Sequence, residues 1–299
     1  MCDIKLIFRQ FKVYVLLIFL LGCVPKNLVN NKEVSNAGSF DFNEITTKLI
    51  TIPTNHKYND VKGFIFSSNG GKVAYYVNSY PKKEEFIVIG DKEDKHYQVV
   101  EHFIFSPNGK RFVYNGFDKP QGLILILDGK EEKLNATDIN QPFFSPNSER
   151  VAYVSEIPDG RELVVVDGMK SELYENVHPH VWFSYDNQKF LYVVEKYDKK
   201  FLIVVDKDRN IYEKEIESNS PPFDTPAFSH NADKIAYIIN KDEQLYVVVE
   251  NLSSKLEAEY GPYNFSVEYL TFSPDGKKLA YKSFQDEDVF VAINGKVGQ

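Results

Sequence analysis

The stretch FSPDGKKLAY, residues 272–281, recurs six times in variant form and decides the fold of this chain. The copies begin at Phe66, Phe105, Phe144, Phe183, Phe228 and Phe272, at intervals of 39, 39, 39, 45 and 44 residues. In every copy a Ser follows the Phe directly and a Tyr lies nine residues after it. A repeat period in this range is typical of solenoids and propellers, in which each repeat is one supersecondary unit.

Each repeat has the pattern of four short strands. The first strand ends at the Phe-Ser pair, a turn rich in Ser, Pro, Asn, Asp and Gly follows, and the second strand carries the Tyr. The third strand is an unbroken apolar run, such as LVVV at 163–166, which predicts burial on both faces. A polar fourth strand, such as 211–216, is suited to an outer edge. The sequence therefore predicts an all-β propeller of four-stranded antiparallel blades.

At the residues FSPDGKKLAY the chain resembles the TolB-type, WD-repeat-like β-propeller family of bacteria. The resemblance covers about residues 63–299, because the motif recurs there six times at one internal spacing. The Pro that the family usually carries two residues before the Phe is present as Pro142 and Pro226 and is replaced in the other four copies. The resemblance implies a propeller and assigns no subfamily.

The two ends of the repeat region predict how the ring closes. The sixth copy ends at Gln299, soon after the Asn294-Gly295 turn, so we expect its fourth strand to be missing. The segment HKYNDV (56–61) occupies the same position relative to Phe66 as HYQVV (96–100) does relative to Phe105. We therefore expect an amino-terminal strand to complete the last of six blades and close the ring, which removes exposed strand edges. Seven blades, with residues 48–52 in a partial blade, are the alternative.

Residues 1–22 have the pattern of a bacterial lipoprotein signal peptide. Basic residues precede an apolar run at 13–21. This run is too short for a transmembrane helix, which needs about 20 apolar residues. The run ends in LLGC (20–23), which resembles the lipobox, whose Cys is diacylated and becomes the first mature residue. An uncleaved anchor or an ordinary cleaved signal is the alternative.

The predicted organisation follows from this signal. We expect a signal peptide over 1–22, a flexible tether over 23–44 and the propeller over 45–299, with palmitate or a similar acyl chain on Cys23. The protein would be a membrane-anchored component of the cell envelope, facing the periplasm or the exterior.

Charge and motifs exclude several functions. The net charge of −8 and the lack of a basic run argue against a nucleic-acid partner. The usual nucleophile, metalloprotease, phosphate and dinucleotide motifs are absent, so no catalytic residue, cofactor or metal ligand is predicted. Asp206, Asp208, Asn210 and Glu217 match part of a calcium-loop pattern, but Ile211 stands where that loop needs Gly. We interpret this segment as a polar hairpin turn.

Candidate binding residues lie three positions before each motif Phe. In a propeller these positions begin the innermost strands, so they should surround one mouth of the central channel. They are Gly63, His102, Gln141, His180, Thr225 and Tyr269. His102 and His180 suggest a small-ligand site, because imidazole is a common ligand, and a solvated channel lining is the alternative.

The two longer repeats suggest a second set of contacts. Their extra residues lie within 217–225 and 260–268 and bring Phe223, Tyr263 and Phe265 to the same end as the channel-mouth residues. Aromatic residues on Pro-stiffened loops suit partner binding. The alternative is that these rings fold back over the blade ends.

Together these patterns favour a non-enzymatic binding or scaffold module for a protein, peptide or glycan partner. An enzyme that acts on carbohydrate, a hydrolase or a lyase using the polar residues of the channel mouth, is the alternative. The fold does not decide between them, and the sequence does not predict an oligomeric state.

Overall fold

The computed structural model describes residues 58, 60–216, 226–253, 255–264, 266–285 and 288–297. The chain divides into two compact units, Met1–Tyr58 and Asn59–Gln299. All regular secondary structure in the described part is β-strand, which confirms the predicted all-β class. No helix that could cross a membrane is found in that part of the chain.

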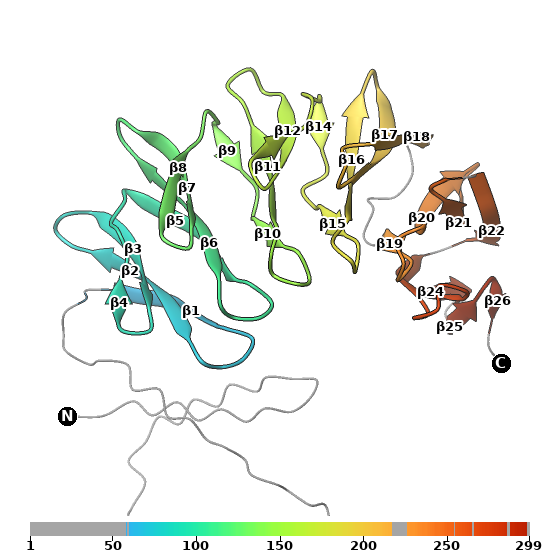
Figure 1. Cartoon of the computed structure of the whole chain (residues 1–299), viewed down its shortest axis with the longest axis horizontal. Coiled ribbons are helices and arrows are strands. Elements are labelled where there is room, and N and C mark those ends of the chain that lie inside the picture. The colour runs from blue at the N-terminus through green and yellow to red at the C-terminus, as the bar shows by residue number, and fades with distance from the viewer. Residues whose placement is uncertain are drawn as a thin grey trace, which may run out of the picture. The chain divides into compact units, whose positions relative to one another are not determined.

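The strands form six antiparallel sheets that follow one another in chain order (Figure 1). Sheet 1 contains β1 (Asp60–Phe66), β2 (Val73–Ser79), β3 (Glu84–Ile89) and β4 (Lys92–Glu93). Sheet 2 contains β5 (Val99–Phe105), β6 (Phe112–Asp118), β7 (Gly122–Leu127) and β8 (Lys130–Lys133). Sheet 3 contains β9 (Asp138–Ile139), β10 (Phe143–Phe144), β11 (Val151–Glu156), β12 (Glu162–Val166) and β13 (Met169–Lys170).

The remaining three sheets repeat this order. Sheet 4 contains β14 (Asn176–Val177), β15 (Trp182–Phe183), β16 (Lys189–Lys196), β17 (Lys199–Asp206) and β18 (Ile211–Ile216). Sheet 5 contains β19 (Ala227–Phe228), β20 (Lys234–Lys241), β21 (Gln244–Asn251) and β22 (Lys255–Tyr263). Sheet 6 contains β23 (Val267–Phe272), β24 (Leu279–Gln285), β25 (Asp288–Ile293) and β26 (Lys296–Val297). In sheets 3 and 4 the first strand is broken in two, because β9 and β10 both pair with β11 and β14 and β15 both pair with β16.

The motif turn has one geometry in all six sheets. In the first copy the Ser67 hydroxyl donates to Asn69 Oδ1 at 2.8 Å and accepts the backbone N–H of Lys72 at 2.9 Å. The equivalent Ser-to-Asx bond is present in every other copy. The fourth turn residue needs a positive φ, which Gly70 adopts at +65° without steric cost. Local hydrogen bonds therefore explain why Ser, Asn, Asp and Gly recur at these positions.

The apolar cores lie between neighbouring sheets. Five buried clusters join sheets 1 and 2, 2 and 3, 3 and 4, 4 and 5, and 5 and 6. The motif Tyr lies on the second strand and is at most 3% exposed in all six sheets. Tyr114 belongs to the cluster that joins sheet 2 to sheet 1, so its ring faces the preceding sheet. The motif thus supplies both the turn within a sheet and the main aromatic contact between sheets.

The end of sheet 6 corrects one expectation. Its fourth strand is present, because β26 pairs with β25 through Ala292↔Val297 and Ile293↔Lys296. Positive φ angles at Asn294 (+48°) and Gly295 (+77°) reverse the chain tightly enough for the last residues to return along β25. Asp60 and Val61 lie in β1, the first strand of sheet 1, rather than in an outer strand of sheet 6. Apart from Tyr58, the rest of the expected closing segment, including residues 48–52, lies outside the described residues.

One face of sheet 6 is exposed although its pattern is that of a core face. Val291 is 59% exposed, whereas its equivalents in the register of the other sheets are at most 4% exposed. Those equivalents are Ile87, Leu125, Val164, Leu202 and Val247. In sheets 1–5 this position packs against the next sheet. Among the described residues no apolar cluster joins sheet 6 to sheet 1.

Candidate binding site at the loop end

The two ends of the sheets carry different chemistry. We define the turn end by the motif turns, such as 67–72 and 184–188. We define the loop end by the connections that lead into each first strand, such as 134–137 and 171–175. The channel-mouth residues named from the sequence precede the motif Phe and so lie toward the loop end. Thr225, Phe223 and Phe265 lie outside the described residues, as does Cys23.

The first strand is irregular wherever a described channel-mouth residue lies. Gly63, His102 and Tyr269 sit at shifts of register in β1, β5 and β23, each with a positive φ between +57° and +66°. Gln141 and His180 lie in the breaks between β9 and β10 and between β14 and β15. These irregularities turn side chains out of the strict alternation of a strand. The shared spacing therefore marks one structural position, as the sequence predicted.

The structure does not bring the two predicted histidines together. His102 is half-buried, and its Nδ1 is buried without a hydrogen-bond partner. His180 is exposed and contacts Phe143 of sheet 3 and Trp182 of its own sheet. No group of three or more His, Cys, Asp or Glu in the described part of the chain is arranged to hold a metal ion.

Four aromatic and imidazole rings form a continuous row at the loop end of sheets 3 and 4. The centroid of Phe143 lies 4.3 Å from that of His180, which lies 5.5 Å from Trp182. The ring of His178 also stacks on that of Trp182, at 5.4 Å and with an interplanar angle of 27°. We call Phe143, His180, Trp182 and His178 the ring row. It joins two sheets, because Phe143 belongs to β10 and Trp182 to β15.

Hydrogen bonds hold the histidines of the ring row. The backbone N–H of His180 donates to His178 Nδ1 at 3.3 Å, and the backbone N–H of His178 donates to the Val193 carbonyl at 2.8 Å. His180 is exposed as a residue, but neighbouring atoms partly desolvate its ring, which lowers the pKa of the imidazole. Phe143, Trp182 and His178 are half-buried, so His180 is the most exposed member of a row whose backbone is tied to β16.

A cavity of 220 Å³ lies beside the ring row. Its lining includes His178, Pro179 and Asn176, together with Glu195 and Lys200 of β16 and β17. Lys200 Nζ lies 3.9 Å from Glu195 Oε1, so the two charges offset one another. The cavity combines an apolar floor with one amide and one ion pair.

Tyr263 packs between two sheets. Its hydroxyl lies 2.5 Å from that of Tyr281, and the rings meet edge to face at 5.8 Å. Tyrosine rings also meet across neighbouring sheets between Tyr97 and Tyr114, at 6.3 Å, and between Tyr174 and Tyr192, at 6.2 Å. The ring of Tyr269, in contrast, is 65% exposed, with Lys282 Nζ 5.7 Å from its centroid. Of the two described aromatics proposed as partner contacts, Tyr269 is therefore the accessible one.

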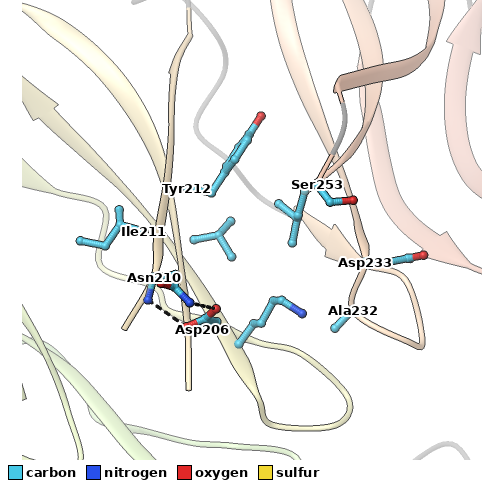
Figure 2. Close-up of a pocket in the computed structure, with 10 residues that line it drawn as sticks. Asp206, Asn210, Ile211, Tyr212, Ala232, Asp233 and Ser253 are labelled. Atoms are coloured by element: carbon cyan, nitrogen blue, oxygen red, sulfur yellow. Dashed lines mark hydrogen bonds between the residues drawn. The ribbon is translucent and has the colours of Figure 1, made fainter. Parts of the chain in front are cut away.

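A second cavity, of 360 Å³, lies between sheets 4 and 5 (Figure 2). It is lined on one side by Asp206, Asn210 and Tyr212 and on the other by Asp233 and Ser253. The Asp206 carboxylate accepts the backbone N–H groups of Asp208 and Asn210 and the Asn210 side-chain amide, at 2.8–2.9 Å. These atoms close the turn between β17 and β18, which is the hairpin turn expected from the sequence.

Close to this second cavity a buried carboxylate ties sheets 4 and 5 together. Glu250 is 2% exposed and accepts hydrogen bonds from the Tyr212 hydroxyl at 2.5 Å and from Lys214 Nζ at 2.9 Å. Burial, and then the hydrogen bond to Glu250, raise the pKa of Tyr212, so its hydroxyl stays protonated. We interpret this cluster as a structural tie, since each partner is already satisfied within the cluster.

Sequence reasoning did not single out Trp182 and Phe143. Trp182 is the single Trp of the chain and follows His178 and His180 at alternate positions, a local concentration of rings that is visible in the sequence. Phe143 was missed because its role depends on the contact between sheets 3 and 4, which no local pattern shows.

Comparisons with known proteins find no matching protein-family model and no matching curated protein. Solved structures with some similarity include a TolB protein from Agrobacterium tumefaciens, with 17% identity, a TM-score of 0.39 and coverage of 69% of this chain and 82% of that one. TolB from Acinetobacter baumannii has 16% identity, a TM-score of 0.40 and coverage of 76% and 62%, so this chain spans less than two thirds of it. The Cps50 (Swd1) β-propeller domain from Myceliophteria thermophila has 14% identity, a TM-score of 0.38 and coverage of 79% and 84%. These similarities assign no function.

Proposed function

We propose that this chain is a lipid-anchored protein of the cell envelope whose propeller is a non-enzymatic binding module, with a partner recognised at the loop end. The observation that carries the proposal is the ring row, together with the exposed ring of Tyr269 at the same end. Phe143, Trp182 and Tyr269 lie on paired strands, and rigid supports favour binding because little conformational entropy is lost. A protein, a peptide or a glycan would each suit such a surface.

We further propose that six blades form a closed ring, completed by the segment that precedes β1. The exposed face of β25 supports this proposal, because Val289, Val291 and Ile293 repeat the apolar pattern that every other sheet buries against its neighbour. In a closed ring this face would meet sheet 1, and Val289, Val291 and Ile293, which are 57%, 59% and 46% exposed, would be withdrawn from water. Closure would also protect the part of the β25 edge that β26 does not cover.

Anchoring depends on a single side chain. We expect Cys23→Ser to abolish incorporation of labelled palmitate and to move the protein from the membrane fraction to the soluble fraction, because the thiol is the acylated atom in the lipobox reading. Cys2→Ser is the matched control and should leave both properties unchanged, since Cys2 lies within the predicted signal peptide. Equal labelling of the wild type and Cys23→Ser would contradict the anchor.

Partner binding can be tested by site-specific cross-linking in cells. A photo-cross-linking residue in place of Tyr269 should give a discrete adduct, and His180→Ala on the same chain should reduce its yield. Tyr185 is the matched control, because it is 60% exposed but lies in the motif turn at the opposite end. Adducts of equal yield from positions 185 and 269, or none from position 269, would refute recognition at the loop end.

A further inference from the structure

The ring row and the cavity beside it form a site of defined chemistry. We propose that they bind a neutral carbohydrate chain, with one pyranose ring lying against the row. This inference rests on the proposed binding function and names the class of its ligand. It is carried by the four-ring geometry and by the polar groups that border it.

The geometry suits the flat apolar side of a sugar. Phe143, His180, Trp182 and His178 follow one another at centroid distances of 4.3, 5.5 and 5.4 Å. Neighbouring rings are inclined by 51°, 40° and 27°, so the four rings do not form one flat stack. Aromatic faces attract the slightly positive C–H groups of a sugar ring for the same electrostatic reason that they attract ring edges.

Charge favours a neutral ligand. The ring row itself contains no carboxylate or ammonium group, and partial desolvation lowers the pKa of the His180 imidazole, which disfavours its charged form. The nearest charges that line the adjoining cavity are Glu195 and Lys200, which offset each other at 3.9 Å. An anionic or cationic ligand would therefore find no uncompensated counter-charge in the described lining of this site.

The polar groups around the row match hydroxyl groups. Asn176 lines the cavity, and Gln141 is exposed two residues before Phe143. Side-chain amides both donate and accept hydrogen bonds, as sugar hydroxyls do. The 220 Å³ cavity is smaller than the about 300–1,000 Å³ of typical small-molecule sites. It would hold one ring of a longer chain rather than enclose a whole ligand.

The single Trp of the chain provides a direct test. Because Trp182 lies in the row, its fluorescence should change saturably when a neutral hexasaccharide binds, and no other Trp contributes. The probes are cellohexaose, hexa-N-acetylchitohexaose and maltohexaose, each titrated to about 10 mM, tenfold above a Kd of about 1 mM. We expect at least one to give a saturable change, and His180→Ala to weaken its binding about tenfold or more.

A matched pair on the opposite end provides the control. Tyr185 and His230 also form an exposed aromatic–imidazole contact, at 5.4 Å, so Tyr185→Ala should leave sugar binding unchanged. No saturable change with any of the three sugars would overturn the inference, as would equal weakening by Tyr185→Ala and His180→Ala. If no sugar binds but the adduct at position 269 still forms, the binding module stands with another class of partner. Loss of both results would refute the proposed function as well.

Discussion

Tyr114→Ala is expected to lower the free energy of unfolding by about 3–5 kcal/mol, the usual cost of removing a large buried aromatic side chain. Tyr114 is fully buried, and its ring lies 6.3 Å from that of Tyr97 and 6.0 Å from that of Phe103. All three belong to the cluster that joins sheets 1 and 2. The truncation would leave a cavity between two sheets, which neither sheet can fill without moving as a whole. Denaturant unfolding followed by far-ultraviolet circular dichroism measures the loss.

Two companion variants separate packing from other effects. Tyr114→Phe keeps the ring contacts and should cost about 1 kcal/mol or less. Tyr185→Ala removes the same side chain from an exposed motif turn and should change the free energy of unfolding by no more than about 0.5 kcal/mol. If Tyr114→Ala were as mild as Tyr185→Ala, the motif Tyr would not hold neighbouring sheets together.

Val291→Asp distinguishes a closed ring from an open one. In a closed ring Val291 would lie in a sixth apolar interface, as Val247 does between sheets 5 and 6. Burying an unpaired carboxylate there should cost more than about 3 kcal/mol. If the face instead remains in water, where Val291 is 59% exposed, the substitution should change the free energy of unfolding by about 0.5 kcal/mol at most.

Val99→Asp is the control for that comparison. Val99 lies on a strand of the same unit and is 40% exposed. Val99→Asp therefore makes the same change in charge and β-propensity as Val291→Asp, but at a position where no interface is predicted. Cysteine labelling gives a second measure of closure, because the chain has only Cys2 and Cys23. In a Cys2→Ser, Cys23→Ser background, a Cys at position 291 should react with a thiol reagent much more slowly than one at position 99. Equal rates would contradict closure.

Residue pattern alone was enough for the strand architecture. The recurring motif, the Ser and the Asn or Asp of each turn and the unbroken apolar third strands are all visible in the sequence, and the structure confirms four-stranded antiparallel sheets. The hairpin at Asp206 was predicted for the same reason, because its hydrogen bonds join residues only two and four apart. The positions three residues before each motif Phe were found through their spacing from a motif that the fold repeats, and their place at a channel mouth stays a prediction.

Contacts between sheets were decided only by the tertiary structure. From the sequence, Tyr263 was predicted to be a partner contact, because it is an aromatic residue in a Pro-containing loop segment. In the structure its hydroxyl lies 2.5 Å from that of Tyr281 in the neighbouring sheet. The return of β26 along β25 depends on the backbone angles of Asn294 and Gly295. The sequence predicted a turn at these two residues but no strand after it. In the sequence Glu250 looks like a surface residue, whereas in the structure Tyr212 and Lys214 of β18 donate hydrogen bonds to it.

By itself, then, the sequence determined a repeated four-stranded unit, its turns and the buried side chains of each unit. Local hydrogen bonds and strand periodicity carry that information over short distances in the chain. Only the tertiary structure decided that the rings of Phe143, His180, Trp182 and His178 stand in one row at the loop end. The row depends on how sheet 3 packs against sheet 4, and that packing is the sum of many weak contacts between residues distant in the chain.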